Sequence, residues 1–383
     1  MKEITVFVLL ASLFFVTQVQ GLGCYSLANI PDFPEHFWGS ADYLYWKIQD
    51  TPEPVPLVEE GQTVVLGGRN ISNDWRSGGR FSLGCWLGEG FPINACHAFG
   101  VDVHYLFLPK ASRKMKVHSS GSPGSPNYNI PFFDVVTGQE ATKPLSLVGV
   151  FSGTGVLKIH NDMQGGEINS YLVFKGGSHL KYGLSGGLRY LGFNESVTFD
   201  VNSPFIADPD VWITQDKFQS QNNFYGGQLG IGAEFSRCGF SAEATLKIAL
   251  GAMCEKARIK GHLLTNDFTG RTTVQEFPGG YFTMPTNSGH HSQTRFAVVP
   301  EFDLNLNYQL TDCLKVRVGY TFLYVSQMLR AGKIIDRNIN PTQSVTIEDP
   351  PTATLVGIPL PKALMNSEGF WTQGVNAGVE FYF

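Results

Sequence analysis

Polar and apolar residues alternate along much of this chain. Over residues 296–308 apolar side chains occupy every second position, and polar residues such as Glu301 and Asp303 stand between them. A second run of the same kind covers 314–324, after a tight connection at 309–313. A period of two indicates a β-strand whose two faces meet different surroundings. The pattern therefore predicts an all-β protein.

The same alternation predicts about ten strands. They are expected near residues 38–50, 78–88, 97–108, 154–175, 180–200, 222–236, 239–262, 295–309, 313–329 and 371–383. Twelve strands stay an alternative if 145–160 forms a hairpin of its own. Several runs reach the roughly 9–11 residues that a membrane-spanning strand needs, whereas strands of soluble proteins average about five or six. This length favours a transmembrane barrel over a large soluble β-sandwich.

Short and long connections alternate along the chain. The short ones are 88–96, 176–180, 236–239 and 309–313, and the long ones are 50–77, 109–153, 201–221, 263–294 and 330–370. Outer-membrane barrels have short periplasmic turns and longer extracellular loops. We therefore predict one antiparallel up-and-down barrel over 38–383, with both chain ends in the periplasm. Because the long loops are rich in turn-forming residues, we expect them to be irregular.

The last strand carries a second signal. Val375, Val379 and Phe381 alternate with polar or small residues, and the chain ends on Phe383. An amphipathic last strand ending in an aromatic residue resembles the signal that outer-membrane proteins present to the barrel-assembly machinery. We predict that Phe383 is this assembly signal, and that the partners of the barrel are this machinery and the lipid of the outer membrane.

The N-terminal segment predicts export. Residues 4–16 are apolar apart from Thr5 and Ser12, a run shorter than the roughly 20 residues that span a bilayer. We predict a signal peptide over 1–23 with cleavage near 21–23, followed by a periplasmic segment over 24–37. Lipidation of Cys24 is the weaker alternative, because Gly21 stands where an aliphatic residue is usual.

Composition narrows the function classes. The 383 residues carry a formal net charge of −5, so no concentrated basic charge suggests a nucleic-acid partner. The mean hydropathy of −0.05 is too low for a helical membrane protein but suits a barrel. No nucleotide-binding or catalytic motif is present, and no C-x-x-C pair suggests zinc. We therefore predict no cofactor, no metal and no enzymatic activity.

Six cysteines add a structural hypothesis. In the predicted topology Cys24, Cys96, Cys238 and Cys313 map to the periplasmic side, with Cys85 nearby. An oxidising compartment permits disulfides. We predict that some of these five form disulfides within or between chains. Buried, unpaired thiols are the alternative.

At family level, the chain resembles the β-barrel porins of planctomycete and chlamydia-related bacteria. The resemblance is carried by residues 38–46 (WGSADYLYW), 55–58, 77–81, 83–86, 223–232 (NFYGGQLGIG), 247–251 (KIALG), 296–301 (FAVVPE), 319–324 (GYTFLY), 330–336 (RAGKIID), 340–342 (NPT) and the closing strand from Phe370. It covers nearly the whole chain after the signal peptide, and no single motif carries it. It implies an outer-membrane barrel with a pore function.

The faces opposite the apolar stripes are expected to line the lumen. They carry the acids Asp42, Asp102, Glu234, Glu243, Glu301, Asp303 and Glu380, and the bases Arg80, Arg189, Lys247, Lys315 and Arg317. Mixed rings of charge can filter solutes by size and field. The alternative is that these groups pair with one another and fill a narrow barrel. The balance of charge predicts no ion preference.

Three functions follow from these features. A porin-like channel for passive diffusion of small hydrophilic solutes or ions is the first. A structural or adhesive barrel with surface-binding loops is the alternative, and assembly into homo-oligomers is compatible with either. An outer-membrane protease is the third, because Asp208, Asp210, His290 and His291 lie in predicted outer loops, where general acid–base chemistry would need them within hydrogen-bond reach.

Overall fold

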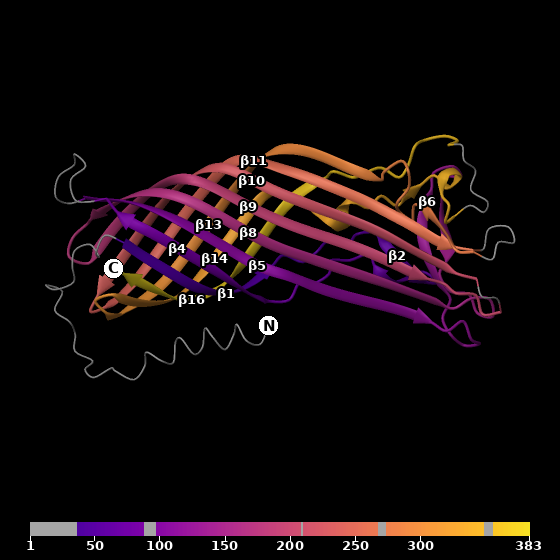
Figure 1. The fold of residues 1–383 in the computed structure, drawn as a ribbon, viewed down its shortest axis with the longest axis horizontal. Helices are drawn as coiled ribbons and strands as arrows, with labels where there is room; N and C mark the ends of the chain where they lie inside the picture. Colours follow the sequence, from indigo (N-terminus) through magenta and orange to yellow (C-terminus); the bar gives the residue numbers. More distant parts are fainter. Residues whose placement is uncertain (1–36, 88–96, 208–209, 267–272, 348–354) are drawn as a thin grey trace.

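Ten long strands dominate the molecule (Figure 1). The computed structural model describes residues 37–87, 97–207, 210–266, 273–347 and 355–383. The long strands are β1 (Phe37–Ile48), β4 (Arg76–Trp86), β5 (His97–Ser119), β8 (Gly153–Lys175), β9 (Leu180–Asn202), β10 (Trp212–Arg237), β11 (Phe240–Thr265), β13 (Gly289–Thr311), β14 (Leu314–Leu329) and β16 (Ser367–Tyr382). The predicted all-β class is confirmed.

The ten strands close into a barrel. Each pairs antiparallel with the strand before it in the series, and β1 pairs with β16 from Trp38 opposite Tyr382 to Ile48 opposite Thr372. The main chains of Phe37 and Phe383 exchange two hydrogen bonds of 3.0 Å beside this seam. The prediction of an up-and-down barrel is confirmed. The stretch that could have added two strands belongs to β8 and the turn before it.

Outward-facing side chains over the lower part of the barrel are apolar, as the alternation predicts. Leu188, Leu229 and Phe296 expose 67%, 74% and 67% of their surface. Within the described residues, no helix is long and apolar enough to cross a membrane.

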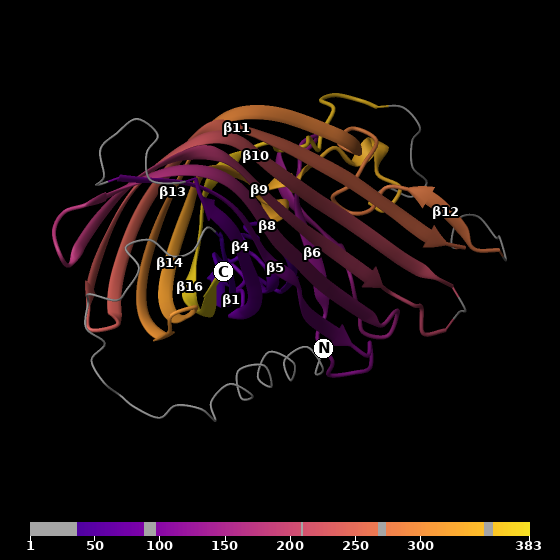
Figure 2. The ribbon, with the colours of Figure 1, turned by 60° about the vertical axis from the view of Figure 1, so that its left-hand side comes forward.

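The barrel wall is higher on one side than on the other. Strand β5 pairs with β4 only as far as Phe107, and β13 pairs with β14 only from Glu301. Beyond these points β5, β8, β9, β10, β11 and β13 continue without β1, β4, β14 and β16, forming a curved half-shell that we call the upper wall (Figure 2). The upper wall therefore occupies parts of the chain that were predicted to be loops, such as 109–119 and 212–221.

The reason for this difference is an inversion of polarity. On β9 the inward side chains of Val197 and Phe199 are buried, and the outward positions on either side of them carry Ser196 and Asp200. In the upper wall the alternation continues with its apolar face turned inward. Short β12 (Gln275–Pro278) pairs with the upper end of β11.

A second, smaller sheet covers the inner face of the upper wall. It contains β2 (Pro56–Glu60), β3 (Thr63–Gly67), β6 (Tyr128–Asp134), β7 (Gln139–Pro144) and β15 (Asn338–Ile339). Two 3-10 helices, η3 (Ala331–Ile334) and η4 (Pro341–Gln343), lie in the segment around β15. We call this sheet, with η3, η4 and the segment 279–288, the cap. These segments were expected to be irregular; the structure gives them short strands and 3-10 helices joined by irregular chain.

The cap is held by its own apolar core. Leu57, Val58, Phe132 and Ile334 are buried against inward side chains of the upper wall such as Phe199. Burial of apolar surface on this scale is the main stabilising contribution in a folded domain. The inverted polarity of the upper wall is thus explained by the cap that covers it.

Candidate functional site: the barrel interior

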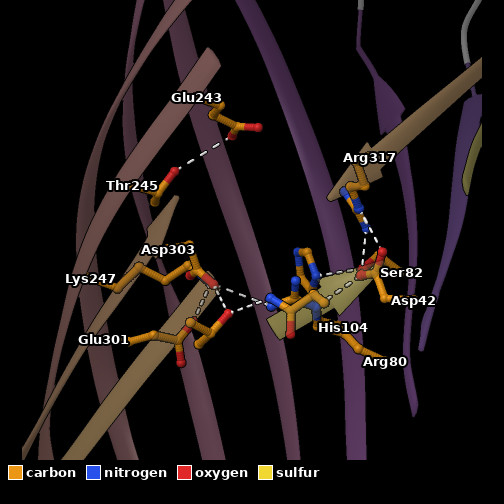
Figure 3. A network of polar contacts seen from close by, with 12 residues as sticks. Asp42, Arg80, Ser82, His104, Glu243, Thr245, Lys247, Glu301, Asp303 and Arg317 are labelled. Carbon is orange, nitrogen blue, oxygen red and sulfur yellow. Dashed lines mark hydrogen bonds and ion pairs between the residues drawn. The ribbon is translucent and has the colours of Figure 1, made fainter. Parts of the chain in front are cut away.

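The lower interior of the barrel holds a layer of charged side chains. We call it the ionic layer; it contains Asp42, Arg80, Glu167, Arg189, Lys247, Glu301, Asp303, Lys315, Arg317 and Glu380. All point inward from barrel strands, because period-two alternation places them opposite the lipid-facing residues. Figure 3 shows how several of them converge.

Arg80 links opposite parts of the wall. Its guanidinium lies 3.0 Å from a carboxylate oxygen of Asp42 on neighbouring β1 and 3.3 Å from Asp303 on β13. Strands β4 and β13 are not neighbours in the barrel, since β1, β16 and β14 lie between them. The contact with Asp303 therefore crosses the lumen.

A second group crosses the lumen between β8, β9, β11 and β13. Arg189 donates a short hydrogen bond to Glu301 and lies 3.5 Å from Glu167. The ammonium of Lys247 lies 3.0 Å from Glu167 and 3.3 Å from Glu301. Two cations and two carboxylates thus neutralise one another, and Gln228 adds a hydrogen bond of 2.9 Å to Glu167.

The third group lies near the seam of the barrel. Arg317 contacts Asp42 at 2.6 Å and Glu380 at 3.2 Å, and Lys315 contacts Glu380 at 3.1 Å. Ser40 accepts a further hydrogen bond of 2.8 Å from Arg317. Asp42 therefore joins this group to Arg80, so that the charges form one connected network.

Nine of the twelve predicted lumen charges lie in the ionic layer. The other three make separate contacts: Asp102 with His104 at 3.0 Å, Glu234 with Lys181 at 4.0 Å, and Glu243 with Thr245 at 3.5 Å. In the structure, the nine predicted charges of the ionic layer form ion pairs with one another in the lumen, as the alternative to an open charged pore predicts.

Glu167 is the central residue that the sequence pattern missed. It follows Gly165 and Gly166, which interrupt the apolar alternation of β8. A period of two counted from Leu157 and Ile159 could have found it. These two residues face inward on β8, so every odd-numbered position of the strand, including 167, faces inward as well. Gln228 and Asn169, which hydrogen-bond around Glu167, were missed in the same way.

An apolar layer lies directly above the ionic layer. We call it the lower apolar layer. Its members include Leu44, Trp46, Leu106, Met163, Phe193, Phe224, Met253, Val299, Leu323 and Phe370, all buried. Phe193 and Phe370 contact each other across the lumen in a tilted arrangement, with their ring centres 4.7 Å apart. Among the described residues, the interior at this height is filled by side chains rather than open.

A buried ion pair fastens the cap above this layer. The side chains of Arg330 and Glu195 have no exposed surface, and their closest N–O distance is 2.9 Å. Glu195 also accepts hydrogen bonds from the hydroxyl of Thr51 at 2.8 Å and the main-chain N–H of Ala331 at 2.9 Å. The guanidinium of Arg330 lies 5.3 Å from the ring centre of Phe370. This arrangement, which we call the clamp, joins β9 to the segments that follow β1 and β14.

Glu53 lies beside the clamp, in the segment between β1 and β2. Its carboxyl group is fully buried, and among the described residues neither oxygen has a hydrogen-bond partner. Burial, together with the nearby charge of Glu195, raises the pKa of Glu53 well above its usual value of 4.5.

A Cβ atom at Gly332 would lie 2.0 Å from the carbonyl oxygen of Pro52, so only glycine fits this contact.

The predicted disulfide residues are free thiols where the structure describes them. Cys85, Cys238 and Cys313 are unpaired, as is Cys254. Cys24 and Cys96 lie outside the described residues, so a disulfide that involves either of them, or one that joins two chains, stays a prediction. Cys238 forms a tight turn with Gly239 at φ angles of 52° and 78°.

The candidate protease residues do not converge as far as the structure describes them. Asp210 lies just before the upper end of β10, whereas His290 lies opposite Arg258, whose partner on β10 is Gln219. About nine residues of extended strand, or roughly 30 Å, separate these levels. His291 donates a hydrogen bond of 2.9 Å from Nε2 to the carbonyl oxygen of Asn287, and Asp208 lies outside the described residues. In this part of the chain no cluster of His, Cys, Asp and Glu could hold a metal ion.

Comparison with known protein families assigns this barrel to a family. Residues 38–383 match the family described as Putative beta barrel porin-7 (BBP7). The chain belongs to this family. The match covers the whole barrel, and confirms the resemblance to bacterial β-barrel porins. As a member of a porin family, the protein resides in the cell outer membrane.

Solved structures with a related outline are distant in sequence. The outer membrane protease OmpT from Escherichia coli is 9% identical, with 94% of this chain and 100% of that chain covered and a TM-score of 0.43. The CymD monoaromatic hydrocarbon channel is 10% identical, with 95% and 94% covered and a TM-score of 0.28. The toluene transporter TodX of Pseudomonas putida is 8% identical, with 92% and 89% covered and a TM-score of 0.23. Among curated proteins, no sequence matches this chain.

Proposed function

We propose that this porin-family barrel is a channel for small hydrophilic solutes or ions, and that it is closed in the conformation of the structure. The observation that carries the proposal is the ionic layer, whose charges of both signs meet in the lumen. Such rings set a transverse field and a size filter for polar solutes. The proposed partners are therefore small hydrophilic solutes, besides outer-membrane lipid and the barrel-assembly machinery.

Closure in this proposal has two parts. The lower apolar layer acts as a hydrophobic constriction, of the kind that gates a pore by excluding water. The cap closes the outer side, and it is fastened to β9 through Arg330 and Glu195. Opening requires the cap to leave the upper wall and the aromatic side chains of the lower layer to change rotamer.

Conductance measurements test this proposal. The wild-type protein, refolded and inserted in a planar bilayer, is expected to give rare, small and discrete openings. The single variant Arg330→Met leaves the carboxylate of Glu195 buried without its cation, which weakens the clamp, and should open more often with the same unit conductance. Arg337→Met, which breaks an exposed ion pair of the cap, is the matched control. Bilayers that stay silent with all three folded proteins would refute the channel.

The packed interior also favours a second candidate. A barrel whose interior is filled by side chains at the level of the lower apolar layer suits a structural or adhesive role in the outer membrane. Silent bilayers together with liposomes that do not swell in small sugars would support this role.

We further propose that the protein is not an enzyme, since Asp210 and His290 lie far apart on the upper wall. Cleavage of any peptide in a diverse panel would contradict this.

A further inference from the structure

The outward face of the upper wall begins at a row of aromatic side chains. One row of directly paired positions crosses the strands from β5 to β13. Its aromatic members are Tyr105 on β5, Tyr190 on β9, Tyr225 on β10 and Phe296 on β13, and small residues occupy the row on β8 and β11. Tyr225 and Phe296 expose 55% and 67% of their surface. Aromatic girdles of membrane barrels lie at the boundary between lipid tails and headgroups. On β9 and β10, Tyr190 and Tyr225 lie directly opposite each other and therefore mark the outer boundary of the hydrocarbon on this part of the wall.

A row of lysines crosses the same wall farther out. Lys114 lies opposite Lys158, Lys158 opposite Thr198, Thr198 opposite Lys217, and Lys217 opposite Lys260. With neighbouring strands about 4.8 Å apart, four ammonium groups fall within a span of about 20 Å. Two pairs of like charge thus stand directly opposite each other, which destabilises a sheet unless a counter-charge is present.

More cations than acids surround this row. Lys110, Lys116, Lys256 and Arg258 also face outward on the upper wall, and all four are exposed. Among the described residues, the outward carboxylates of β8 and β9 are both engaged, and the exposed Glu276 lies at the outer end of this face on β12. Asp200 pairs with Lys158 at 2.8 Å, and Asp162 accepts a hydrogen bond of 2.8 Å from Asn194. The face is therefore strongly positive on a chain whose net charge is −5.

A shallow hollow of about 400 Å³ lies in this face, between the aromatic row and the lysine row. Lys110, Lys256 and Arg258 line it, together with the carboxylate of Asp162 and uncharged polar side chains such as Ser196 and Gln219. Ammonium, guanidinium, hydroxyl and amide groups are the donors that bind phosphate oxygens. The hollow and the lysine row thus offer several phosphate contacts on one surface.

The height of the lysine row restricts the ligand. Thr198 lies eight residues beyond Tyr190 on β9. That is about 26 Å along the strand, or about 20 Å along the membrane normal for a tilt of about 40°. Phospholipid headgroups extend only about 5–8 Å beyond the hydrocarbon on each side. A ligand that reaches the row from the membrane must have a much larger headgroup.

We propose that this face binds the phosphorylated sugar headgroup of an outer-leaflet glycolipid of the lipopolysaccharide type. The phosphates nearest the lipid tails contact the hollow, and those on the sugars beyond contact the lysine row. Figure 2 shows the strands β8 to β11 of the upper wall extending side by side beyond the barrel. The site lies on the outer surface, so it is independent of whether the channel opens.

A charge-removal variant tests this site. Lys217→Gln, Arg258→Gln and Lys260→Gln together remove three cations from the centre of the face. The matched control, Lys175→Gln, Lys181→Gln and Arg237→Gln, removes three near the periplasmic turns. Binding of phosphorylated rough-type lipopolysaccharide to the full-length protein in nanodiscs is measured by titration. Since each basic residue contributes about fivefold, the first variant should bind on the order of a hundredfold more weakly and the control unchanged.

Three further probes separate the sources of phosphate. Dephosphorylated lipopolysaccharide should bind wild type as weakly as phosphorylated lipopolysaccharide binds the variant. Phosphatidylglycerol nanodiscs and soluble polyphosphate should not distinguish wild type from the variant. Equal affinity of both folded proteins for lipopolysaccharide would overturn the proposal. The proposal would also be overturned if wild type bound phosphatidylglycerol or polyphosphate more tightly than the variant does, by the same factor as for lipopolysaccharide. That result would assign the face to lipids with short headgroups or to free polyanions.

Discussion

At the scale of single residues, Arg330 and Glu195 are the most consequential pair. Both charges are fully buried, and the 2.9 Å contact joins the cap to β9. Replacing Arg330 by Met leaves the carboxylate of Glu195 buried without its cation, which typically costs about 3–5 kcal/mol. We expect Arg330→Met to lower the free energy of cap unfolding by about this amount. Hydrogen exchange of cap amides measures it.

A double-mutant cycle identifies the source of this loss. Adding Glu195→Met to Arg330→Met should restore much of the stability, because no unpaired charge is then buried. The exposed pair of Arg337 and Glu140 serves as the control, and its removal should cost only about 0–1 kcal/mol. Equal losses for the two arginine variants would contradict the importance of burial.

Glu53 makes the stability of the cap depend on pH. Its pKa in the folded protein is raised well above 4.5, so the folded state holds this proton more tightly than the unfolded chain. The resulting stabilisation is complete below pH 4.5, and it is lost as pH rises through the pKa of the folded state. In Glu53→Gln, which stays neutral, cap stability should decline less as pH rises. Hydrogen exchange of residues 49–55 and 331–335 across this range compares the two proteins, and parallel pH profiles would contradict the assignment.

At the scale of elements, the lower strands follow directly from their sequence, and the upper ones do not. The alternation of β16 predicts which of its side chains face outward and which face the lumen, as Val375 and Asn376 do. This works because the outward face of this strand contacts only lipid. In the upper wall the same period persists, but Val197 and Phe199 are buried by the cap. A sequence pattern gives the period, not the identity of the surface that covers each face.

The contacts of the ionic layer were also beyond the reach of pattern alone. Alternation placed Arg80, Asp303 and Glu301 on inward faces. Which of them meet depends on the stagger of strands around the barrel, because a register shift of two residues moves a side chain by about 7 Å. Arg80 therefore contacts Asp303 from four strands away, a pairing that separation in the sequence does not encode.

The last strand supports a prediction about assembly. The main chain of Phe383 pairs with Phe37, but its side chain is 58% exposed. Phe383→Ala should therefore change the stability of the refolded barrel by less than about 1 kcal/mol, while lowering the amount assembled in cells several-fold. Heat-modifiable gel mobility measures both. Phe381→Ala, on the same outward face, is the control, and equal assembly of the two variants would argue against a terminal signal.

At the scale of the whole molecule, the half-shell leaves two strand edges that a fully closed barrel would lack. Among the described pairings, β5 beyond Phe107 has only β8 as a neighbour, and β13 before Glu301 has only β11. Open edges invite pairing with another chain, and lysine on an edge opposes this. Lys114 and Lys116 face outward on the exposed edge of β5. The charges thus help to keep the chain from joining others through this edge.

Removing these charges should change the oligomeric state. Lys114→Val with Lys116→Val gives the β5 edge residues that favour strand pairing, so we expect dimers or larger assemblies in detergent. Lys217→Val with Lys260→Val removes the same charge from strands that have neighbours on both sides, and should stay as the wild type. Light scattering after size-exclusion chromatography measures the mass of each. Association of both variants would attribute the effect to lost surface charge, and association of neither would mean that the edge is protected by its geometry rather than by its lysines.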